Sequence, residues 1–440
     1  MKIGFVSLGC SKNLVDTEVM LKRLADAGYT ITPDETEADI IVVNTCGFIQ
    51  SAKEEAIDNI LDVAWLKKNR ALKGIIATGC LVERYREQVL EEMPEVDAVL
   101  GTGSYHKIVE AVKAVARGEK YASFEDKNAA PLGGERIVTT PPYTAYLKVA
   151  EGCDNRCTYC AIPLIRGRMR SRRMEDVVAE AKSLEKIGVK ELNIIAQDTS
   201  RYGLDLYGKY MLPELVQKIL TETQIPWIRL LYLYPDKITD ELVAVIRDND
   251  RVCKYVDLPI QHVNDTVLAR MNRHGDGAVV RAAVEKIRRE IPGVTLRTTA
   301  IVGFPGETEA QFAELCEFVK ETGFDRFGAF TYSPEEGTPA AEFPDQIDEQ
   351  VKQDRYDTLM AVQLAVSEKK MQERLGDVVE VLCEGYDPVA GVQYGRSRAD
   401  APDVDGKVYF TSAKKLPEGV FVNVKITKAL DYDLFGEAVR

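Results

Sequence analysis

The sequence has no long hydrophobic run. A membrane-spanning helix needs about 18 or more consecutive apolar residues, and no uninterrupted run in the 440 residues approaches that length. Residues 1–10 end in Leu8-Gly9-Cys10, as a lipoprotein processing site does, but they are shorter than the roughly 15 to 30 residues of a signal peptide. We therefore expect a cytoplasmic chain without a membrane anchor, in a compartment where thiols stay reduced.

An excess of basic residues is also missing. The chain has 57 lysines and arginines against 70 aspartates and glutamates, which gives a net charge of -13. This balance argues against a surface that is generally built to hold nucleic acid. Tandem repeats and low-complexity tracts are absent, and an apolar content of 45% excludes a disordered chain. Because 440 residues exceed the roughly 250 to 300 that one core serves, we expect two or three domains.

Histidine is scarce, whereas cysteine is not. The three histidines, His106, His262 and His274, lie far along the chain from residues 153–160, and there are nine cysteines. An odd number of cysteines in a large intracellular chain is typical of ligands, nucleophiles or core residues and not of a disulfide framework.

The overall pattern predicts an α/β protein that begins with an open parallel sheet over residues 1–117. Short apolar runs typical of strands alternate there with amphipathic stretches typical of helices. The expected strands are 3–8, 39–43, 74–77 and 96–100, and the expected helices are 13–27, 50–69, 82–92 and 105–116. Residues 118–138 contain Pro131, Gly133 and Gly134 with little periodicity, so we expect a linker.

A second and longer series of strands and helices predicts a parallel (β/α)6 barrel, incomplete or complete, over residues 139–370. Its expected strands are 145–149, 191–196, 228–233, 255–258, 295–302 and 326–332. In such a barrel the chemistry lies at the carboxyl ends of the strands. One long charged helix follows Gln346 and ends at Gly376, and short β-branched runs then predict a small antiparallel β-barrel over residues 372–440, of a kind that binds a macromolecule.

Cys153, Cys157 and Cys160 form a C-x-x-x-C-x-x-C motif directly after the first strand of the second series. A structural zinc ion would need a fourth protein ligand, and none lies nearby in sequence. Three thiolates on one loop suit a 4Fe-4S cluster that leaves one iron open. Zinc, a redox-active pair of cysteines and plain core cysteines remain the alternatives.

Cys10, Cys46 and Cys80 form a second set, because each closes an expected strand of the first domain. The carboxyl ends of neighbouring parallel strands share one edge of the sheet, so the three thiols are expected to converge there and to hold a second 4Fe-4S cluster. The alternative is that three buried cysteines end strands by accident. The remaining cysteines, Cys253, Cys316 and Cys383, show no pattern and are expected to be packing residues.

The segment Glu151-Gly-Cys-Asp-Asn-Arg-Cys-Thr-Tyr-Cys-Ala-Ile-Pro163 resembles the signature loop of radical S-adenosylmethionine enzymes. The resemblance implies that the open iron binds S-adenosylmethionine and that an electron from the cluster cleaves it to a radical. It also implies that an electron donor such as flavodoxin or ferredoxin supplies that electron. Five residues match family segments near the cofactor and are expected to contact it: Tyr159, Gln197, Gln261, Arg297 and Gly303.

The two cysteine sets together with the terminal β domain resemble the methylthiotransferases over essentially the whole chain. Three segments are similar to the branch that modifies an aspartate of small-subunit ribosomal protein S12: residues 4–16, 196–203 and 395–406. The resemblance implies that a sulfur donor loads the first-domain cluster and that S12, free or in the ribosomal subunit, is the substrate. The alternatives are the branch that modifies a tRNA adenosine and, in another class, an iron-sulfur electron carrier without turnover.

Charge gives an independent view of the partner. From Gly376 to Arg440 there are eight basic and eleven acidic residues, a net charge of 8 minus 11, or -3. This balance opposes RNA binding and favours a basic protein, which Asp400, Asp403 and Asp405 are expected to attract. Five arginines between Arg166 and Arg173 form a basic segment, in contrast to this acidic balance. They are expected either to contact a substrate anion or to form a solvated loop.

Overall fold

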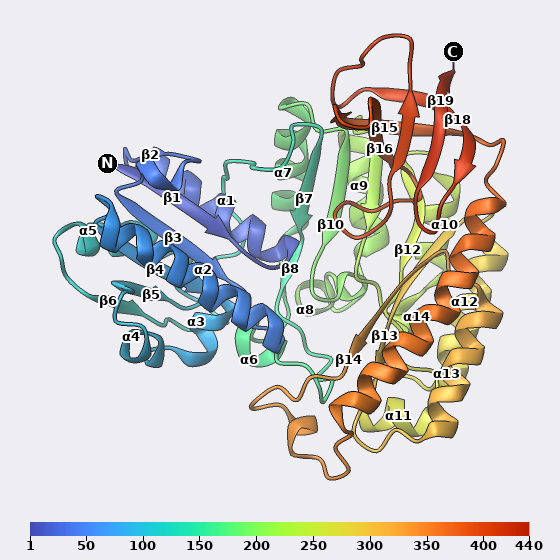
Figure 1. Ribbon diagram of the computed structural model, residues 1–440, viewed down its shortest axis with the longest axis horizontal. Coiled ribbons are helices and arrows are strands. Elements are labelled where there is room, and N and C mark those ends of the chain that lie inside the picture. Colours follow the sequence, from blue (N-terminus) through green and yellow to red (C-terminus); the bar gives the residue numbers. More distant parts are fainter. Residues whose placement is uncertain (440) are drawn as a thin grey trace.

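The first domain is an all-parallel sheet of six strands in the order β2-β1-β3-β4-β5-β6 (Figure 1). The computed structural model describes residues 1–439. The strands are β1 (Lys2–Ser7), β2 (Thr30–Ile31), β3 (Ile40–Thr45), β4 (Gly74–Gly79), β5 (Ala98–Leu100) and β6 (Tyr121–Ser123). The helices are α1 (Ser11–Asp26), α2 (Gln50–Asn69), α3 (Cys80–Tyr85), α4 (Gln88–Glu92) and α5 (Ile108–Ala116).

The central strand β3 explains why this sheet is covered on both faces. Ile40 and Val42 belong to a core with α1 and α5, whereas Ile41 and Val43 belong to a core with α2. A strand buried on both faces carries an unbroken apolar run, which is typical of parallel sheets. The edge strand β6 was not expected, since residues 121–123 fall in the predicted linker; they pair with β5 and extend the first sheet.

The second domain is an open sheet of six parallel strands in the order β14-β13-β12-β11-β10-β7. Among the described residues β7 and β14 do not pair, so the barrel is partial. Its strands are β7 (Thr144–Lys148), β10 (Glu191–Ile195), β11 (Trp227–Leu230), β12 (Val252–Asp257), β13 (Thr295–Val302) and β14 (Arg326–Thr331), and the short β8 (Ala150–Glu151) and β9 (Arg170–Ser171) pair separately. Between and after them lie α6 (Ile162–Arg166), α7 (Met174–Lys186), α8 (Leu204–Tyr207), α9 (Leu212–Glu222), α10 (Asp240–Asp248), α11 (Asp265–Arg270), α12 (Gly277–Glu290), α13 (Glu309–Thr322) and α14 (Glu349–Gln372).

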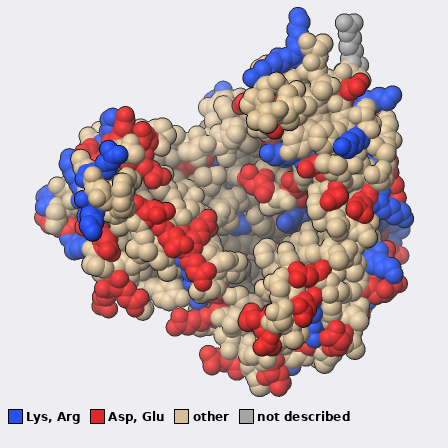
Figure 2. All heavy atoms as spheres, in the orientation of Figure 1, with Lys and Arg blue, Asp and Glu red and all other residues tan. Residues whose placement is uncertain are grey.

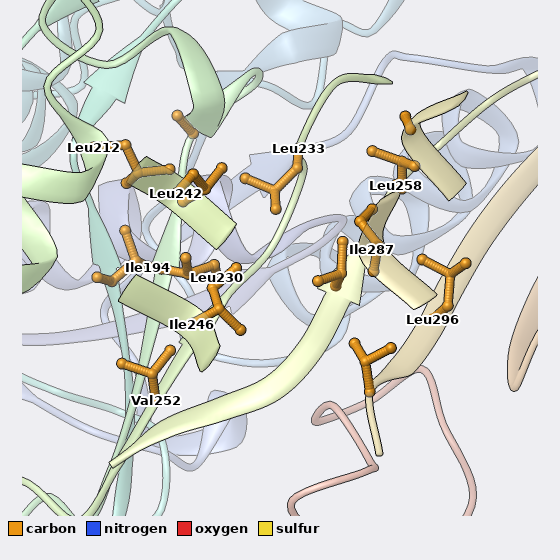
Figure 3. Packing of buried hydrophobic residues seen from close by; sticks show 14 of the residues in the cluster. Ile194, Leu212, Leu230, Leu233, Leu242, Ile246, Val252, Leu258, Ile287 and Leu296 are labelled. Carbon is orange, nitrogen blue, oxygen red and sulfur yellow. The ribbon is translucent and has the colours of Figure 1, made fainter. Parts of the chain in front are cut away.

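The main core of the second domain lies between this sheet and its outer helices. Figure 3 shows Ile194 and Leu230 of the sheet packed close to Leu212, Leu242 and Ile246 of the helices. These five side chains are at most 2% exposed. The convex face of the sheet is therefore sealed by helices, and the concave face is left for other contacts.

The terminal domain is a closed barrel of five strands in the order β15-β16-β17-β19-β18. The strands are β15 (Val378–Asp387), β16 (Val392–Ser397), β17 (Val408–Thr411), β18 (Phe421–Ala429) and β19 (Leu434–Val439). Four of the strand pairs are antiparallel, but β17 pairs with β19 in parallel. The predicted small β-barrel is confirmed, and its pairing is antiparallel except in this one pair, because closure brings strands of the same direction side by side.

The terminal barrel covers part of the concave face of the second domain. Leu382 and Ala401 pack in one buried cluster with Trp227, Tyr255 and Ile195 of the barrel strands. Figure 1 shows the terminal strands above that sheet, with loops reaching down to it.

The aspartates expected to attract a basic partner are used in this contact. Asp400 pairs with Arg326, Asp405 accepts a hydrogen bond of 2.6 Å from Tyr255, and their side chains are 3% exposed. Asp403 remains exposed and accepts a hydrogen bond of 2.8 Å from Tyr146. The expectation that all three form a docking surface is therefore wrong, since a count of charges does not separate solvated carboxylates from those paired within the fold.

Among residues 1–439 no helix is long and apolar enough to cross a membrane.

Candidate functional site

The loop of Cys153, Cys157 and Cys160 lies between β8 and α6 and is held by backbone contacts on both sides. Cys153 N–H donates to Gly167 O at 3.2 Å, and Thr158 N–H donates to Met271 O at 3.0 Å. Arg156 adopts a φ of 53°, and its carbonyl accepts a hydrogen bond of 2.9 Å from Asn272. These contacts fix the turn that presents three thiols on one short segment.

The three thiols line one cavity of about 410 Å³, together with Lys127, Asn128, Leu164, Arg168 and other residues. Burial raises the pKa of Cys153 to about 12 and also raises the pKa of Cys160. A metal would displace these protons, because it is the thiolate that binds metals. The cavity gives the three sulfurs shared open space, which a cluster requires.

A cluster and a single metal ion place different demands on their ligands. Among residues 1–439, no three His, Cys, Asp or Glu side chains converge closely enough to hold one metal ion. Each cysteine of a 4Fe-4S cluster binds a different iron, so its ligands stand farther apart than those of one zinc ion. A 4Fe-4S cluster at Cys153, Cys157 and Cys160 stays a prediction, with zinc as its alternative.

Cys10, Cys46 and Cys80 follow three neighbouring strands, β1, β3 and β4, at the same edge of the first sheet. Gly9, with a φ of 85°, brings the first and second cysteines together: a Cβ on Gly9 would lie 3.1 Å from Cys46 Sγ. Burial opposes ionisation of Cys10, but Lys12 and Arg166 outweigh it and lower its pKa. Burial raises the pKa of Cys80 to about 12 despite Arg166.

The two cysteine sets lie next to each other across the boundary of the domains. Cys80 packs in a small buried cluster with Ala161, which precedes α6 of the second domain, and with Ile165 of that helix. Ala161 directly follows Cys160. The edge of the first sheet thus faces the loop of the second set, and Figure 2 shows the molecule hollowed between the first domain and the barrel.

A buried network of four charges connects these two edges. Lys148 bonds to Glu151 at 2.7 Å and also to Asp16. Arg166 bonds to Asp16 at 2.5 Å and lies 3.4 Å from Glu151. Asp16 belongs to α1, whereas the other three residues belong to the second domain. Sequence reasoning missed this network, because Lys148, Asp16 and Glu151 carry no motif that marks them as partners.

The five arginines between Arg166 and Arg173 do not act as one group. Arg166 and Arg172 are 2% and 7% exposed, and Arg172 pairs with Glu180 at 2.6 Å. Arg170 donates to Ala130 O at 2.5 Å, while Arg168 and Arg173 point to solvent with side chains 76% and 72% exposed. Only Arg168 and Arg173 are therefore solvated, whereas Arg166, Arg170 and Arg172 are bonded within the protein.

Two of the residues expected to contact S-adenosylmethionine carry unpaired polar atoms. Gln197 donates its Nε2 to Glu151 at 2.9 Å, but its Oε1 is buried without a hydrogen-bond partner. Gln261 has a φ of 68°, and its Oε1 is likewise buried and unpaired. A buried acceptor without a donor carries a free-energy cost that a bound polar ligand removes. Both residues therefore fit a cofactor contact, which stays a prediction.

Tyr159, Arg297 and Gly303 have protein partners that account for them without a cofactor. Tyr159 packs beside Phe304 and Tyr332, and burial raises its pKa. Arg297 bonds to Asp257 at 2.8 Å and lies 3.7 Å from Asp405 of the terminal domain.

Gly303 has a φ of 73°, and a Cβ there would lie 2.3 Å from Cγ of Lys352. Close packing therefore explains why this position is glycine. As contacts to S-adenosylmethionine, Tyr159, Arg297 and Gly303 stay predictions.

Another pair beside the second cysteine set was also not expected from the sequence. Asn155 donates to Asp198 at 2.7 Å, and both are buried. Asp198 follows Gln197 on the loop after β10, so this bond ties the cysteine loop to a predicted cofactor loop. The resemblance of residues 196–203 to a known segment was the available signal, but it did not reveal the pairing.

Comparisons with known protein families match three separate parts of the chain. Residues 2–101 match the Uncharacterized protein family UPF0004, residues 147–319 match the Radical SAM superfamily, and residues 375–439 match the TRAM domain. The chain is 50% identical over 441 residues to the ribosomal protein uS12 methylthiotransferase RimO of Desulforamulus reducens, covering 100% of this chain and 99% of that protein. This chain belongs to the uS12 methylthiotransferase family.

Two further members of the uS12 methylthiotransferase family extend this relationship. The chain is 49% identical over 439 residues to the RimO protein of Lachnoclostridium phytofermentans, with 100% of both chains covered. It is 50% identical over 441 residues to that of Geobacter sulfurreducens, covering 100% of this chain and 98% of that protein. As a member of this family and of the radical SAM superfamily, the chain is a transferase.

Solved structures share the fold of this methylthiotransferase. The radical S-adenosylmethionine methyltransferase TsrM of Kitasatospora setae, solved with cobalamin and a [4Fe-4S] cluster, has a TM-score of 0.57 at 14% identity, covering 77% of this chain and 73% of that chain. The cobalamin-dependent enzyme OxsB has a TM-score of 0.52 at 12% identity, covering 81% of this chain and 56% of that chain. At these identities the likeness supports the fold alone.

Proposed function

We propose that this chain attaches a methylthio group to an aspartate side chain of ribosomal protein S12 (uS12). The observation that carries the proposal is full-length identity of about half to proteins with that name, combined with two cysteine triads that meet at one domain boundary. In the proposal Cys153, Cys157 and Cys160 hold one 4Fe-4S cluster with S-adenosylmethionine, and Cys10, Cys46 and Cys80 hold another. When bound, these groups supply the one-electron chemistry that an unreactive C–H bond requires.

The protein itself positions these groups and shields them. The backbone around Cys153 and Thr158 fixes the first loop, and the bond between Asn155 and Asp198 ties it to the loop after β10. Gln197 and Gln261 each keep an unpaired buried oxygen that would accept a hydrogen bond from the cofactor. No side chain is assigned as a catalytic acid or base.

A surface of the first domain favours a protein substrate over RNA. Helices α2 and α4 and the residues beside them carry exposed carboxylates without an ion pair among residues 1–439: Glu54, Glu55, Asp58, Asp62, Glu87, Glu91, Glu92 and Glu95. Figure 2 shows acidic side chains gathered where Figure 1 draws α2. Such a surface repels phosphates and attracts a basic protein.

The test is a direct comparison of the two macromolecular substrates. Anaerobically reconstituted full-length protein is given S-adenosylmethionine, a reductant and sulfide, together with either uS12 or tRNA. Peptides and nucleosides are then analysed by mass spectrometry, and one methylthio group on an aspartate of uS12 is expected. Modification of a tRNA adenosine with unmodified uS12 would contradict the proposal and favour the tRNA alternative.

The same reaction without a substrate separates an enzyme from an electron carrier. Reduced protein is expected to cleave S-adenosylmethionine to 5′-deoxyadenosine. An electron carrier would not form this product, so its formation distinguishes the two classes. Flavodoxin or ferredoxin is the proposed electron donor, and the sulfur donor is tested by replacing sulfide in the assay.

A further inference from the structure

Arg166 belongs to the second domain, but its side chain ends in the cysteine site of the first. It is the last residue of α6 and is 2% exposed. Its Nη2 donates to Cys80 Sγ at 3.4 Å and to Asn13 Oδ1 at 3.1 Å. One guanidinium group thus holds a predicted cluster ligand and the start of α1 together.

The charges around Arg166 are balanced only while its own charge is present. Asp16 and Glu151 contribute two negative charges, and Lys148 and Arg166 contribute two positive charges. All four side chains are at most 11% exposed. Removal of the Arg166 charge would leave one uncompensated negative charge beside Cys80, where little water can screen it.

The backbone on either side of Arg166 is tied to both cysteine sites. Thr102 of the first domain donates to Ile165 O at 2.7 Å, and the carbonyl of Gly167 accepts the Cys153 N–H at 3.2 Å. A displacement of Arg166 would therefore move the support of Cys80 and the support of Cys153 together.

We propose that Arg166 is a positioning residue that the second domain contributes to the cluster of the first domain. It orients the Cys80 sulfur, raises the reduction potential of the cluster bound there and fixes that cluster relative to the second. Hydrogen bonds and positive charge near cluster sulfurs favour the reduced, more negative state. This inference rests on the proposed first-domain cluster.

The experiment isolates the first-domain cluster in the full-length chain. The background variant replaces Cys153, Cys157 and Cys160 by alanine, so that the iron that remains belongs to Cys10, Cys46 and Cys80. Iron content and the reduction potential are measured in this background, the latter by spectroelectrochemical titration. R166Q, which removes the charge, is expected to lower the potential, and R166K, which keeps it, is expected to lower it less.

The matched control is R173Q, because Arg173 lies seven residues away with a side chain 72% exposed and does not line the cysteine cavity. It is expected to leave iron content and potential unchanged. An R166Q variant with full iron content and an unchanged potential would overturn the role of Arg166 alone. A background variant that binds no iron would overturn the first-domain cluster, and the inference with it.

Unfolding of the iron-free protein shows how a loss of iron in R166Q is to be interpreted. If iron is lost while iron-free R166Q is still folded and unfolds cooperatively, as R173Q does, the loss supports ligand positioning. If the iron-free protein is itself unfolded in both R166Q and R166K, Arg166 acts as a general structural residue and the inference fails.

Discussion

Arg396 of the terminal barrel and Glu191 of β10 form a buried ion pair of 2.5 Å, with side chains 3% and 0% exposed. Arg229 approaches the same carboxylate at 2.9 Å. Burial opposes ionisation of Glu191, but the two guanidinium groups outweigh it and lower its pKa to about 2. The terminal domain is thus attached to the barrel through charges that solvent does not reach.

The first prediction concerns this attachment. Replacement of one partner of a buried ion pair leaves the other uncompensated and typically costs about 3–5 kcal/mol, so E191Q is expected to lower the free energy of unfolding by that amount. R398M is the control, because the pair of Arg398 and Glu380 is exposed and such pairs contribute at most about 1 kcal/mol. Denaturant unfolding of the iron-free proteins measures both, and equal effects would contradict the prediction.

The same pair predicts a dependence on pH. The pKa of Glu191 is about 2 in the folded chain and 4.5 ordinarily, so its contribution to stability is present above about pH 4.5 and is lost as the pH falls toward 2. The difference in unfolding free energy between the unaltered chain and E191Q is expected to shrink over that interval. A constant difference from pH 6 down to pH 3 would show that ionisation of Glu191 is not responsible.

The second prediction concerns iron. Two clusters require about eight irons per chain after anaerobic reconstitution. Alanine at Cys153, Cys157 and Cys160 is expected to leave about four and to abolish formation of 5′-deoxyadenosine. Alanine at Cys10, Cys46 and Cys80 is expected to leave about four as well, while cleavage of S-adenosylmethionine survives and methylthio transfer fails. Full iron content in the latter variant would refute the first-domain cluster.

The third prediction concerns the acidic surface of α2. Reversal of the exposed carboxylates Asp58 and Asp62 to lysine is expected to raise the KM for uS12 several-fold and to make it less sensitive to salt, because exposed charges are screened beyond about 8 Å at physiological ionic strength. Cleavage of S-adenosylmethionine without uS12 is expected to stay unchanged. E317K/E321K is the control, with the same spacing on the exposed side of α13. An equal rise in KM for both pairs would exclude α2 as a specific contact.

The fourth prediction separates packing from cofactor binding at Gly303. G303A places a methyl group against Lys352 and is expected to lower the free energy of unfolding of the iron-free chain by about 1–3 kcal/mol. Gly293 is the control: its φ is 71°, but a Cβ there meets nothing within 4 Å. G293A thus measures the backbone strain alone. If both variants unfold alike and only G303A weakens binding of S-adenosylmethionine, the cofactor role predicted from the sequence is the correct one.

Periodicity predicted most of the elements, because long apolar or amphipathic segments carry a strong signal. The expected strand 295–302 and the expected helix 50–69 coincide with β13 and α2. Two of the strands that were missed, β2 and β6, lie at the edges of the first sheet. Edge strands are short and half exposed, so they lack the unbroken apolar run that identifies β3.

The candidate site was likewise predictable from the sequence only in part. The positions of Cys10, Cys46 and Cys80 at one sheet edge follow from a general rule for parallel strands. The partnership of Arg166 with Cys80 does not, because it joins residues 86 positions apart through the packing of two domains. The sequence also does not reveal that Asp400 is paired with Arg326, because it does not distinguish an aspartate that faces solvent from one that faces a guanidinium group.

The seating of the terminal barrel has a consequence for biosynthesis. Leu382 and Ala401 cover Trp227, Tyr255 and Ile195 on the concave face of the second domain. A ribosome delivers the chain from its amino end, so the barrel strands emerge well before the segment that covers them. A nascent chain stopped at residue 375 would expose an aromatic surface and leave Arg326 without its partner Asp400. The chain is therefore most prone to aggregation during the interval before its last 65 or so residues are made.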